Sequence, residues 1–281
     1  MLLDNIITGI IVLVAFFIIF LIGKIVNDLL HREYNLKEEL VEKDNAAVAL
    51  TVTGYYLGLV LSIGGSIVGP DGHMVDDLLD LCIYGVLGIV LLNISWFICD
   101  KLMLRRFSVS DELIRDKNQG TGAVLAGMNI ASGFIIFGAL QGQGGSIWTA
   151  VVYWALGQIV LIIGGLIFNW ITPYDIHAEI EKDNVAVGVG FGGALTAVGV
   201  TIGLSAKYDF VSWNESLTEF LFYAVLGLLL LPVVRFLTDK VLIPGVKLTD
   251  EIAHQEEPNV GAAYIECFAY ISAAFIIHWC I

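Results

Sequence analysis

Three carboxylates lie inside stretches of sequence that are otherwise apolar enough to enter a membrane. Glu266 is seven residues into the apolar stretch 260–281, and Asp80 and Glu219 stand near the starts of two other apolar stretches. An ionised group at the centre of a bilayer costs roughly 2.5–3.5 kcal/mol on insertion scales, so each needs a partner or a function. Proton or cation transfer is the chemistry that such groups carry, which makes these acids the candidate site.

Glu266 is the strongest of the three candidates, because it interrupts a repeated apolar pattern. The same position in three related segments holds Val52, Leu125 and Phe191. One interpretation is a neutral carboxyl that is hydrogen-bonded to a neighbouring helix, since burial favours the protonated form. The other interpretation is a residue that couples transport to a proton or a cation. The sequence leaves both open.

Asp80 and Glu219 each have a tyrosine four residues further on, Tyr84 and Tyr223 respectively. Residues four apart share one face of a helix, so each acid and its tyrosine are expected to be neighbours. These pairs form a second candidate polar site. They lie about one helical turn inside an outer surface, so simple contact with water is the alternative.

The chain offers little support for metal, cofactor or enzyme chemistry. Its cysteines, Cys82, Cys99, Cys267 and Cys280, lie in apolar stretches without metal-ligand spacing, so we expect small core residues. We find no Walker loop, no glycine fingerprint in a strand-to-helix setting and no nucleophile-base pair, so an enzyme is not expected. The net charge of −14 lacks the basic footprint of a nucleic-acid-binding protein.

The composition places the chain in a membrane. It is 57% hydrophobic and 15% charged, and its mean hydropathy is +0.82. Continuous apolar runs without alternation predict transmembrane helices rather than a β-barrel. The fold class is therefore all-α integral membrane, with eight predicted spans near residues 6–26, 46–68, 78–98, 120–140, 147–168, 185–205, 217–237 and 260–281.

The second half of the chain repeats the first. Glu42-Lys43-Asp44-Asn45 recurs 139 positions later as Glu181-Lys182-Asp183-Asn184. We therefore predict two membrane repeats, residues 1–145 and 146–281, with four spans each. Four crossings return the chain to its starting side, so the two repeats are expected to be parallel rather than inverted.

Four long, charged linkers each end in an asparagine: Asn45, Asn118, Asn184 and Asn259. A span rich in small residues follows each asparagine, which divides the chain into four helical hairpin units and predicts an inner bundle of small-residue spans. The asparagines either cap these spans or line an anion site where helix N-termini converge. The spacing of apolar residues in the linkers predicts short amphipathic helices at the membrane interface.

All but one of the 14 Lys and Arg residues lie on the side of the long linkers, the exception being Lys207. The positive-inside rule then places the linkers in the cytoplasm and both termini outside.

The Asn-led, Gly/Ala-rich span after a charged Glu-Lys-Asp-Asn linker, duplicated along the chain, resembles the YjfL-like family. These are bacterial inner-membrane proteins built from a duplicated domain of unknown function 350. The resemblance covers essentially the whole chain and implies a multi-pass protein of the bacterial inner (plasma) membrane. It implies no activity, substrate or cofactor. Unit four departs from the pattern, because Pro258 precedes its asparagine and its linker is two residues longer.

Two functions compete. A transporter or channel for a small solute or ion would have a polar cavity among the glycine-rich spans, with Glu266, Asp80 or Glu219 facing it. A non-transporting scaffold or partner subunit would have a dry bundle, a bonded Glu266 and linkers that bind a protein. The sequence slightly favours transport. Apolar outer spans also suggest a homodimer in the lipid bilayer.

Overall fold

The computed structural model describes residues 2–68, 74–141, 144–205 and 210–281. Within these ranges the chain is helical and contains no strand. Eight helices are long and apolar enough to cross a membrane, which confirms the all-α prediction and its eight spans. They are α1 (Leu2–Leu30), α2 (Ala46–Gly64), α3 (Met74–Ile98), α5 (Gln119–Gln141), α6 (Ile147–Ile171), α8 (Val185–Ser205), α9 (Trp213–Leu237) and α10 (Val260–Cys280).

Helices α3 and α9 begin four residues earlier than the apolar pattern predicts. Their first turns carry Asp76 and Asp77 in α3 and Glu215 in α9. Acids are favourable at a helix N-terminus, so these polar residues extend each helix beyond its apolar stretch. Lys207, the basic residue that the sequence places opposite the linkers, lies outside the described residues.

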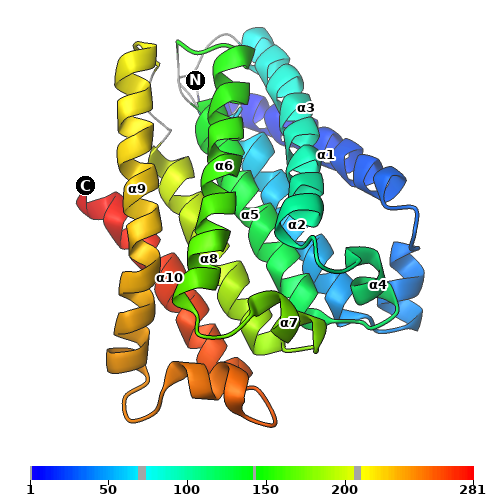
Figure 1. Cartoon of the computed structure of the whole chain (residues 1–281). Helices are drawn as coiled ribbons and strands as arrows, with labels where there is room; N and C mark the ends of the chain where they lie inside the picture. The colour runs from blue at the N-terminus through cyan, green and yellow to red at the C-terminus, as the bar shows by residue number, and fades with distance from the viewer. Residues whose placement is uncertain (1, 69–73, 142–143, 206–209) are drawn as a thin grey trace.

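Short helical segments occupy the four long linkers. They are η1 (Glu38–Glu42), α4 (Val109–Ile114), α7 (Ile176–Glu181) and η4 (Asp250–His254), while η2 (Cys99–Met103) and η3 (Thr238–Leu242) continue α3 and α9. All of them lie at one end of the bundle, the linker end, where Figure 1 shows α4 and α7. The opposite end, where short turns join the helices, is the turn end.

The apolar faces of the linker helices pack against the rest of the protein. Ile176, Ile180 and Ile252 have no exposed surface, and Leu113 is 2% exposed. These side chains belong to the same buried cluster as residues of α2, α5, α8 and α10. The apolar residues of the linker helices therefore pack on the ends of the spans.

The eight spans form two rows, and each hairpin unit contributes one helix to each row. The inner row runs α2, α5, α8, α10, and the outer row runs α1, α3, α6, α9, each helix contacting the next. Figure 1 shows α3, α6 and α9 in front of α5 and α8. Because every outer helix ends and every inner helix begins at the linker end, the two halves have the same orientation.

Burial follows the two rows. In α8, 89% of the membrane-spanning window is buried within the protein, against 11% in α1, which lies on the outside of the bundle. The prediction that small-residue spans form the inner bundle therefore holds for the central helices. The boundary predicted at residues 145 and 146 falls between α5 and α6.

Glycines let the inner helices touch backbone to backbone. A Cβ atom added at Gly127 of α5 would lie 2.2 Å from the carbonyl oxygen of Gly192 in α8. A Cβ added at Gly54 of α2 would lie 2.2 Å from the Cα of Ala126 in α5. Lipid tails are as apolar as side chains, so such close packing is a main source of attraction between helices in a bilayer.

We predict that Gly127→Ala separates α5 from α8 and lowers the free energy of unfolding by about 1–3 kcal/mol or more, the usual cost of overpacking. Thermal unfolding in detergent would measure this loss. Gly9→Ala is the matched control, because a Cβ added there meets nothing within 4 Å. Equal stability of the two variants would contradict the close packing of α5 on α8.

Candidate functional site at the linker end

The four linker asparagines occupy the N-terminal ends of the inner helices. Asn45 Oδ1 accepts hydrogen bonds from the backbone N–H groups of Ala47 and Val48. The other three oxygens each accept from one backbone N–H of the following turn, at Thr121, Val187 and Ala262. Each asparagine thus satisfies backbone donors that a helix N-terminus leaves free. The oxygens are directed at the helix itself, not at a shared anion site.

Each asparagine also binds a glutamate of its own linker helix. The amide nitrogens of Asn45, Asn118, Asn184 and Asn259 donate to Oε2 of Glu39, Glu112, Glu179 and Glu251, at 2.9, 2.7, 3.3 and 2.8 Å respectively. The backbone N–H of each asparagine donates to the carbonyl of the same glutamate. Side chain and backbone therefore tie each linker helix to the start of its span.

The surroundings of these glutamates differ between units. At Glu39, burial is outweighed by hydrogen bonds from Lys43 and Asn45, so its pKa lies below the usual range. At Glu112, burial raises the pKa above the usual range, with the nearby acids Asp116, Asp183 and Glu181 adding to the effect. The second unit therefore holds a carboxyl that gains a proton more readily than its counterpart in the first.

The other N–H of each asparagine amide reaches the next unit. Asn45 Nδ2 donates to the carbonyl of Leu113 in α4 at 2.8 Å, and Asn118 Nδ2 donates to that of Ile180 in α7 at 2.6 Å. Asn184 Nδ2 donates to the carbonyl of Ile252 in η4 at 2.9 Å. We call each set of bonds, from cap to glutamate to next carbonyl, an asparagine latch. The latches join the units in a row.

A left-handed residue precedes each of the first three asparagines. The φ angles of Asp44, Lys117 and Asp183 are 49°, 52° and 62°. Such angles are uncommon for residues with a side chain, so the surrounding bonds must hold them. The fourth unit has Pro258 at this place, and a proline ring fixes φ near −65°. The fourth unit therefore reaches its asparagine without a left-handed residue at this place.

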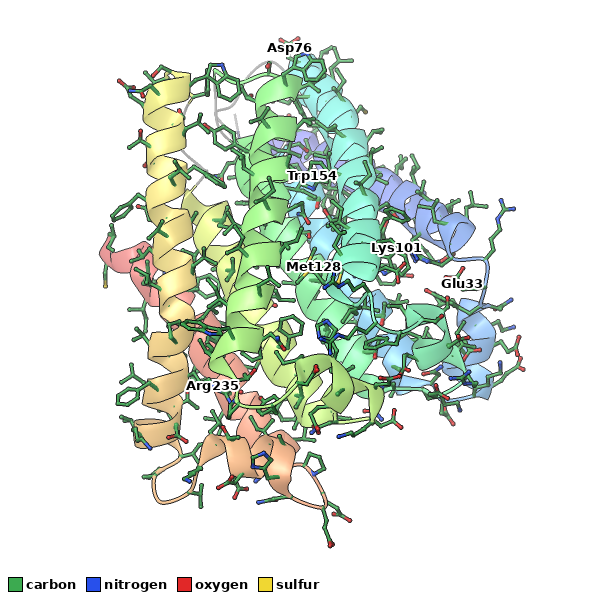
Figure 2. The ribbon with its side chains drawn as sticks, viewed as in Figure 1. Glu33, Asp76, Lys101, Met128, Trp154 and Arg235 are labelled. Atoms are coloured by element: carbon green, nitrogen blue, oxygen red, sulfur yellow. The ribbon has the colours of Figure 1, made fainter. Side chains whose placement is uncertain are left out.

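Glu266 is fully buried, and it pairs with Arg235 of α9. Arg235 Nη1 lies 2.6 Å from Glu266 Oε1, and Arg235 is 8% exposed. Arg235 Nη2 reaches Thr249 Oγ1 at 3.4 Å. Figure 2 shows Arg235 at the linker end of the bundle. The interaction is a charge-assisted hydrogen bond of the strong kind. Arg235 is thus the partner of Glu266 that the sequence analysis did not identify.

Aromatic rings surround this ion pair. The Arg235 guanidinium carbon lies 5.9 Å from the ring centre of Phe168 and 5.7 Å from that of Tyr174. Burial raises the pKa of Tyr174 to about 12, so its hydroxyl keeps its proton at neutral pH. Tyr270, one turn beyond Glu266 in α10, has no exposed surface. The cluster links α6, α9 and α10 at one level of the bundle.

Asp80 and Glu219 are not brought to this cluster. Both side chains are exposed, Tyr84 is half-buried and Tyr223 is 7% exposed. Glu219 and Arg235 are sixteen residues apart in α9, which is about 24 Å of helix. Figure 2 shows Asp76, one turn before Asp80, at the end opposite Arg235. Within the described residues, no group of three or more His, Cys, Asp or Glu side chains could hold a metal ion.

Sequence reasoning missed Arg235 as the partner of Glu266, because it counted Arg235 among the basic residues that set the topology. A signal was present. Arg235 takes the place of Trp96 in the repeat, and Glu266 takes the place of Leu125. Two opposite charges that both interrupt the apolar repeat, in consecutive spans, indicate a pair. The latch glutamates were missed too, although each precedes its asparagine by five to eight residues.

Known proteins resemble the chain along its whole length. A family model described as Domain of Unknown Function (DUF350) matches residues 1–140 and again residues 144–281. A UPF0719 transmembrane protein of Aquifex aeolicus (strain VF5) is 23% identical over 268 residues, which cover 94% of this chain and 96% of the relative.

A second relative corresponds to about one half of the chain. The UPF0719 transmembrane protein YshE of Bacillus subtilis (strain 168) is 24% identical over 125 residues, which cover 44% of this chain and 87% of the relative. No solved structure matches the chain.

We predict that Glu266→Gln lowers the free energy of unfolding by about 3–5 kcal/mol, because it leaves the buried Arg235 without a counter-charge. The double variant Arg235→Met with Glu266→Leu should recover most of this loss, since apolar residues can replace a buried pair. Thermal unfolding of the purified variants measures both. If the single variant is as stable as the parent chain, Glu266 does not hold the bundle through Arg235.

We predict that Asn118→Ala destabilises the chain more than Asn259→Ala does, by at least about 1 kcal/mol. Both changes remove a cap and a glutamate partner, but only the first leaves the buried carbonyl of Ile180 without its donor. Denaturant unfolding of the two variants gives the difference. Equal losses would show that the bond between units contributes nothing to stability.

Proposed function

The chain belongs to the DUF350 family, and from that premise and its latched geometry we propose that it is a non-transporting scaffold of the bacterial inner membrane. The row of asparagine latches is the observation that carries the proposal. Each of the first three units is fastened to the next by the same bonds. A repeated structure of this kind is suited to be a platform on which another protein assembles.

Rigid packing of the inner row supports a static role. Many transporters rock one repeat against another to open each side in turn. Here the α5 helix of the first half and the α8 helix of the second half meet backbone to backbone at Gly127 and Gly192, and at Gly138 and Gly203. Sliding one half past the other would break these contacts and the Asn118–Ile180 bond between the halves.

The state of Glu266 supports the same role. A coupling carboxylate must meet water or its ion during a transport cycle. Glu266 has no exposed surface and is bonded to Arg235. A buried charge pair that joins two helices is suited to holding a structure together.

The linker tips provide the surface for a partner. Residues 42–44, 115–117 and 181–183 are exposed and charged, and each segment leads directly into a buried asparagine. The latches therefore present these tips in a row at fixed spacing. We propose that a protein binds this row in the cytoplasm, with both termini of the chain outside and a second copy of the chain beside it in the bilayer.

A second candidate, transport of a small solute or ion, is favoured by buried polar atoms that have no hydrogen-bond partner among the described residues, including Glu266 Oε2. Asn129 of α5 is 1% exposed, and neither polar atom of its side chain has a hydrogen-bond partner among the described residues. A buried amide without a partner is costly, and an internal water or ion would satisfy it. A polar path through the inner row would supply that water.

Cysteine labelling separates the two candidates. In a chain with its four native cysteines replaced, we predict that Asn129→Cys does not react with a membrane-impermeant thiol reagent applied to either side, because the scaffold is dry at that depth. Glu38→Cys, at an exposed linker position, is the control and should react only from the cytoplasmic side. Labelling at position 129 would favour transport, and labelling at position 38 from outside would overturn the orientation.

A further inference from the structure

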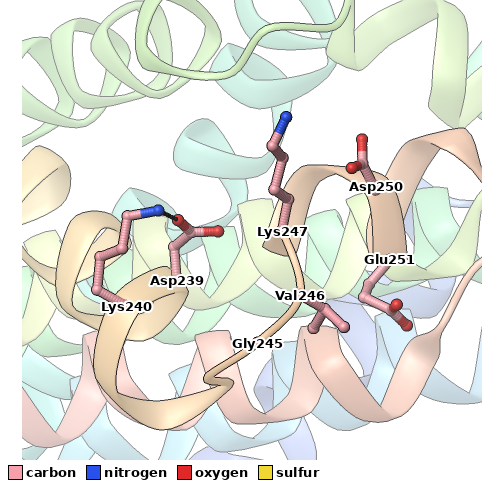
Figure 3. Close-up of a pocket in the computed structure, with 7 residues that line it drawn as sticks. All are labelled: Asp239, Lys240, Gly245, Val246, Lys247, Asp250 and Glu251. Carbon is pink, nitrogen blue, oxygen red and sulfur yellow. Dashed lines mark ion pairs between the residues drawn. The ribbon is translucent and has the colours of Figure 1, made fainter.

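An open cavity of about 530 Å³ lies in the linker of the fourth unit, between η3 and η4. Figure 3 shows its lining, which is Asp239, Lys240, Gly245, Val246, Lys247, Asp250 and Glu251. The volume falls in the range of roughly 300–1,000 Å³ that small-molecule pockets occupy. Because η3 directly continues the membrane-spanning α9, the cavity lies at the membrane surface.

Charged side chains of both signs line the cavity on two sides. Asp239 and Lys240 are paired at 2.7 Å, and Asp239 Oδ1 also accepts the backbone N–H of Leu248 at 2.7 Å, which fixes this wall. In Figure 3 the Lys247 ammonium points away from that pair. The carboxylates of Asp250 and Glu251 come from η4 on the other side. The open cavity thus carries both ammonium groups and carboxylates on its lining.

An apolar rim adjoins these charges. Val241, Leu242 and Val246 are 63%, 47% and 46% exposed. At the end of a transmembrane helix, exposed apolar side chains contact acyl chains, while Lys side chains reach the headgroups. A ligand with a charged head and apolar tails would match both parts of this surface.

We propose that the cavity binds the headgroup of a zwitterionic aminophospholipid of the phosphatidylethanolamine type. Lys247 binds its phosphate and Asp250, which points to the same side in Figure 3, accepts a hydrogen bond from its primary ammonium. An anionic lipid is disfavoured, because three carboxylates stand against two ammonium groups in the lining. The bound lipid is a component distinct from the protein partner of the scaffold.

The second unit of the chain explains why the site is confined to the fourth. Its corresponding segment keeps the acid-base pair, as Asp100 and Lys101, which are 2.6 Å apart. Ser108 stands where the fourth unit has Lys247, so the second cation is missing. Arg106 in that segment pairs instead with Asp175 of the third unit.

Lipid titration tests the proposal. The purified full-length chain is delipidated in detergent and titrated with short-chain phosphatidylethanolamine or phosphatidylglycerol, and bound lipid is counted by native mass spectrometry. We expect phosphatidylethanolamine to bind more tightly than phosphatidylglycerol. Lys247→Gln should weaken its binding about fivefold, the equivalent of about 1 kcal/mol for one Lys near a lipid surface. Lys37→Gln, at an exposed linker lysine, should leave binding unchanged.

Further arms distinguish the alternatives. Asp250→Asn should reduce the preference for phosphatidylethanolamine over phosphatidylglycerol, and it provides the test if Lys247→Gln fails to fold. Binding that is unchanged in both folded variants would overturn the proposal. So would tighter binding of phosphatidylglycerol by the parent chain. Binding of soluble O-phosphoethanolamine as tight as that of the lipid would overturn the lipid as the ligand.

Discussion

The side-chain amide of a linker asparagine is the interaction on which the rest of this structure depends. In each of the first three units its oxygen caps an inner helix, one N–H binds a glutamate of its own linker, and the other N–H binds a carbonyl of the next unit. One planar amide group therefore holds the helix cap, the linker helix and the next unit in place. Because Asn45, Asn118 and Asn184 are all buried, these bonds do not compete with water.

The fourth unit of the inner row differs from the first three. Nine residues after the asparagine, the first three units place Gly54, Gly127 and Gly193 toward the following helix. The fourth unit has Phe268 at that position, which is 68% exposed. A ring of this size prevents a further helix from approaching as closely.

The Arg235–Glu266 pair lies in the fourth unit, where the asparagine latch is incomplete. Asn259 has its cap and its glutamate but is exposed, unlike the three buried asparagines. The ion pair joins α9 to α10 in this unit, where α10 has a neighbour on one side of the inner row only. A buried charge can therefore serve assembly rather than ion movement, which is why depth in the membrane alone does not assign a function.

The fold class, the eight spans, the duplication and the position of each asparagine could all be predicted from the sequence, because they follow from local composition and from a repeat along the chain. Glu266 also stood out as exceptional. The partners could not be predicted before the helices were packed, since Arg235 and Glu266 are 31 residues apart and Asn45 and Leu113 are 68 apart. Such pairings depend on how helices pack, which periodicity along one helix does not encode. The same packing left Asp80 and Glu219 exposed at the turn end and placed Glu266 in a bonded cluster at the linker end.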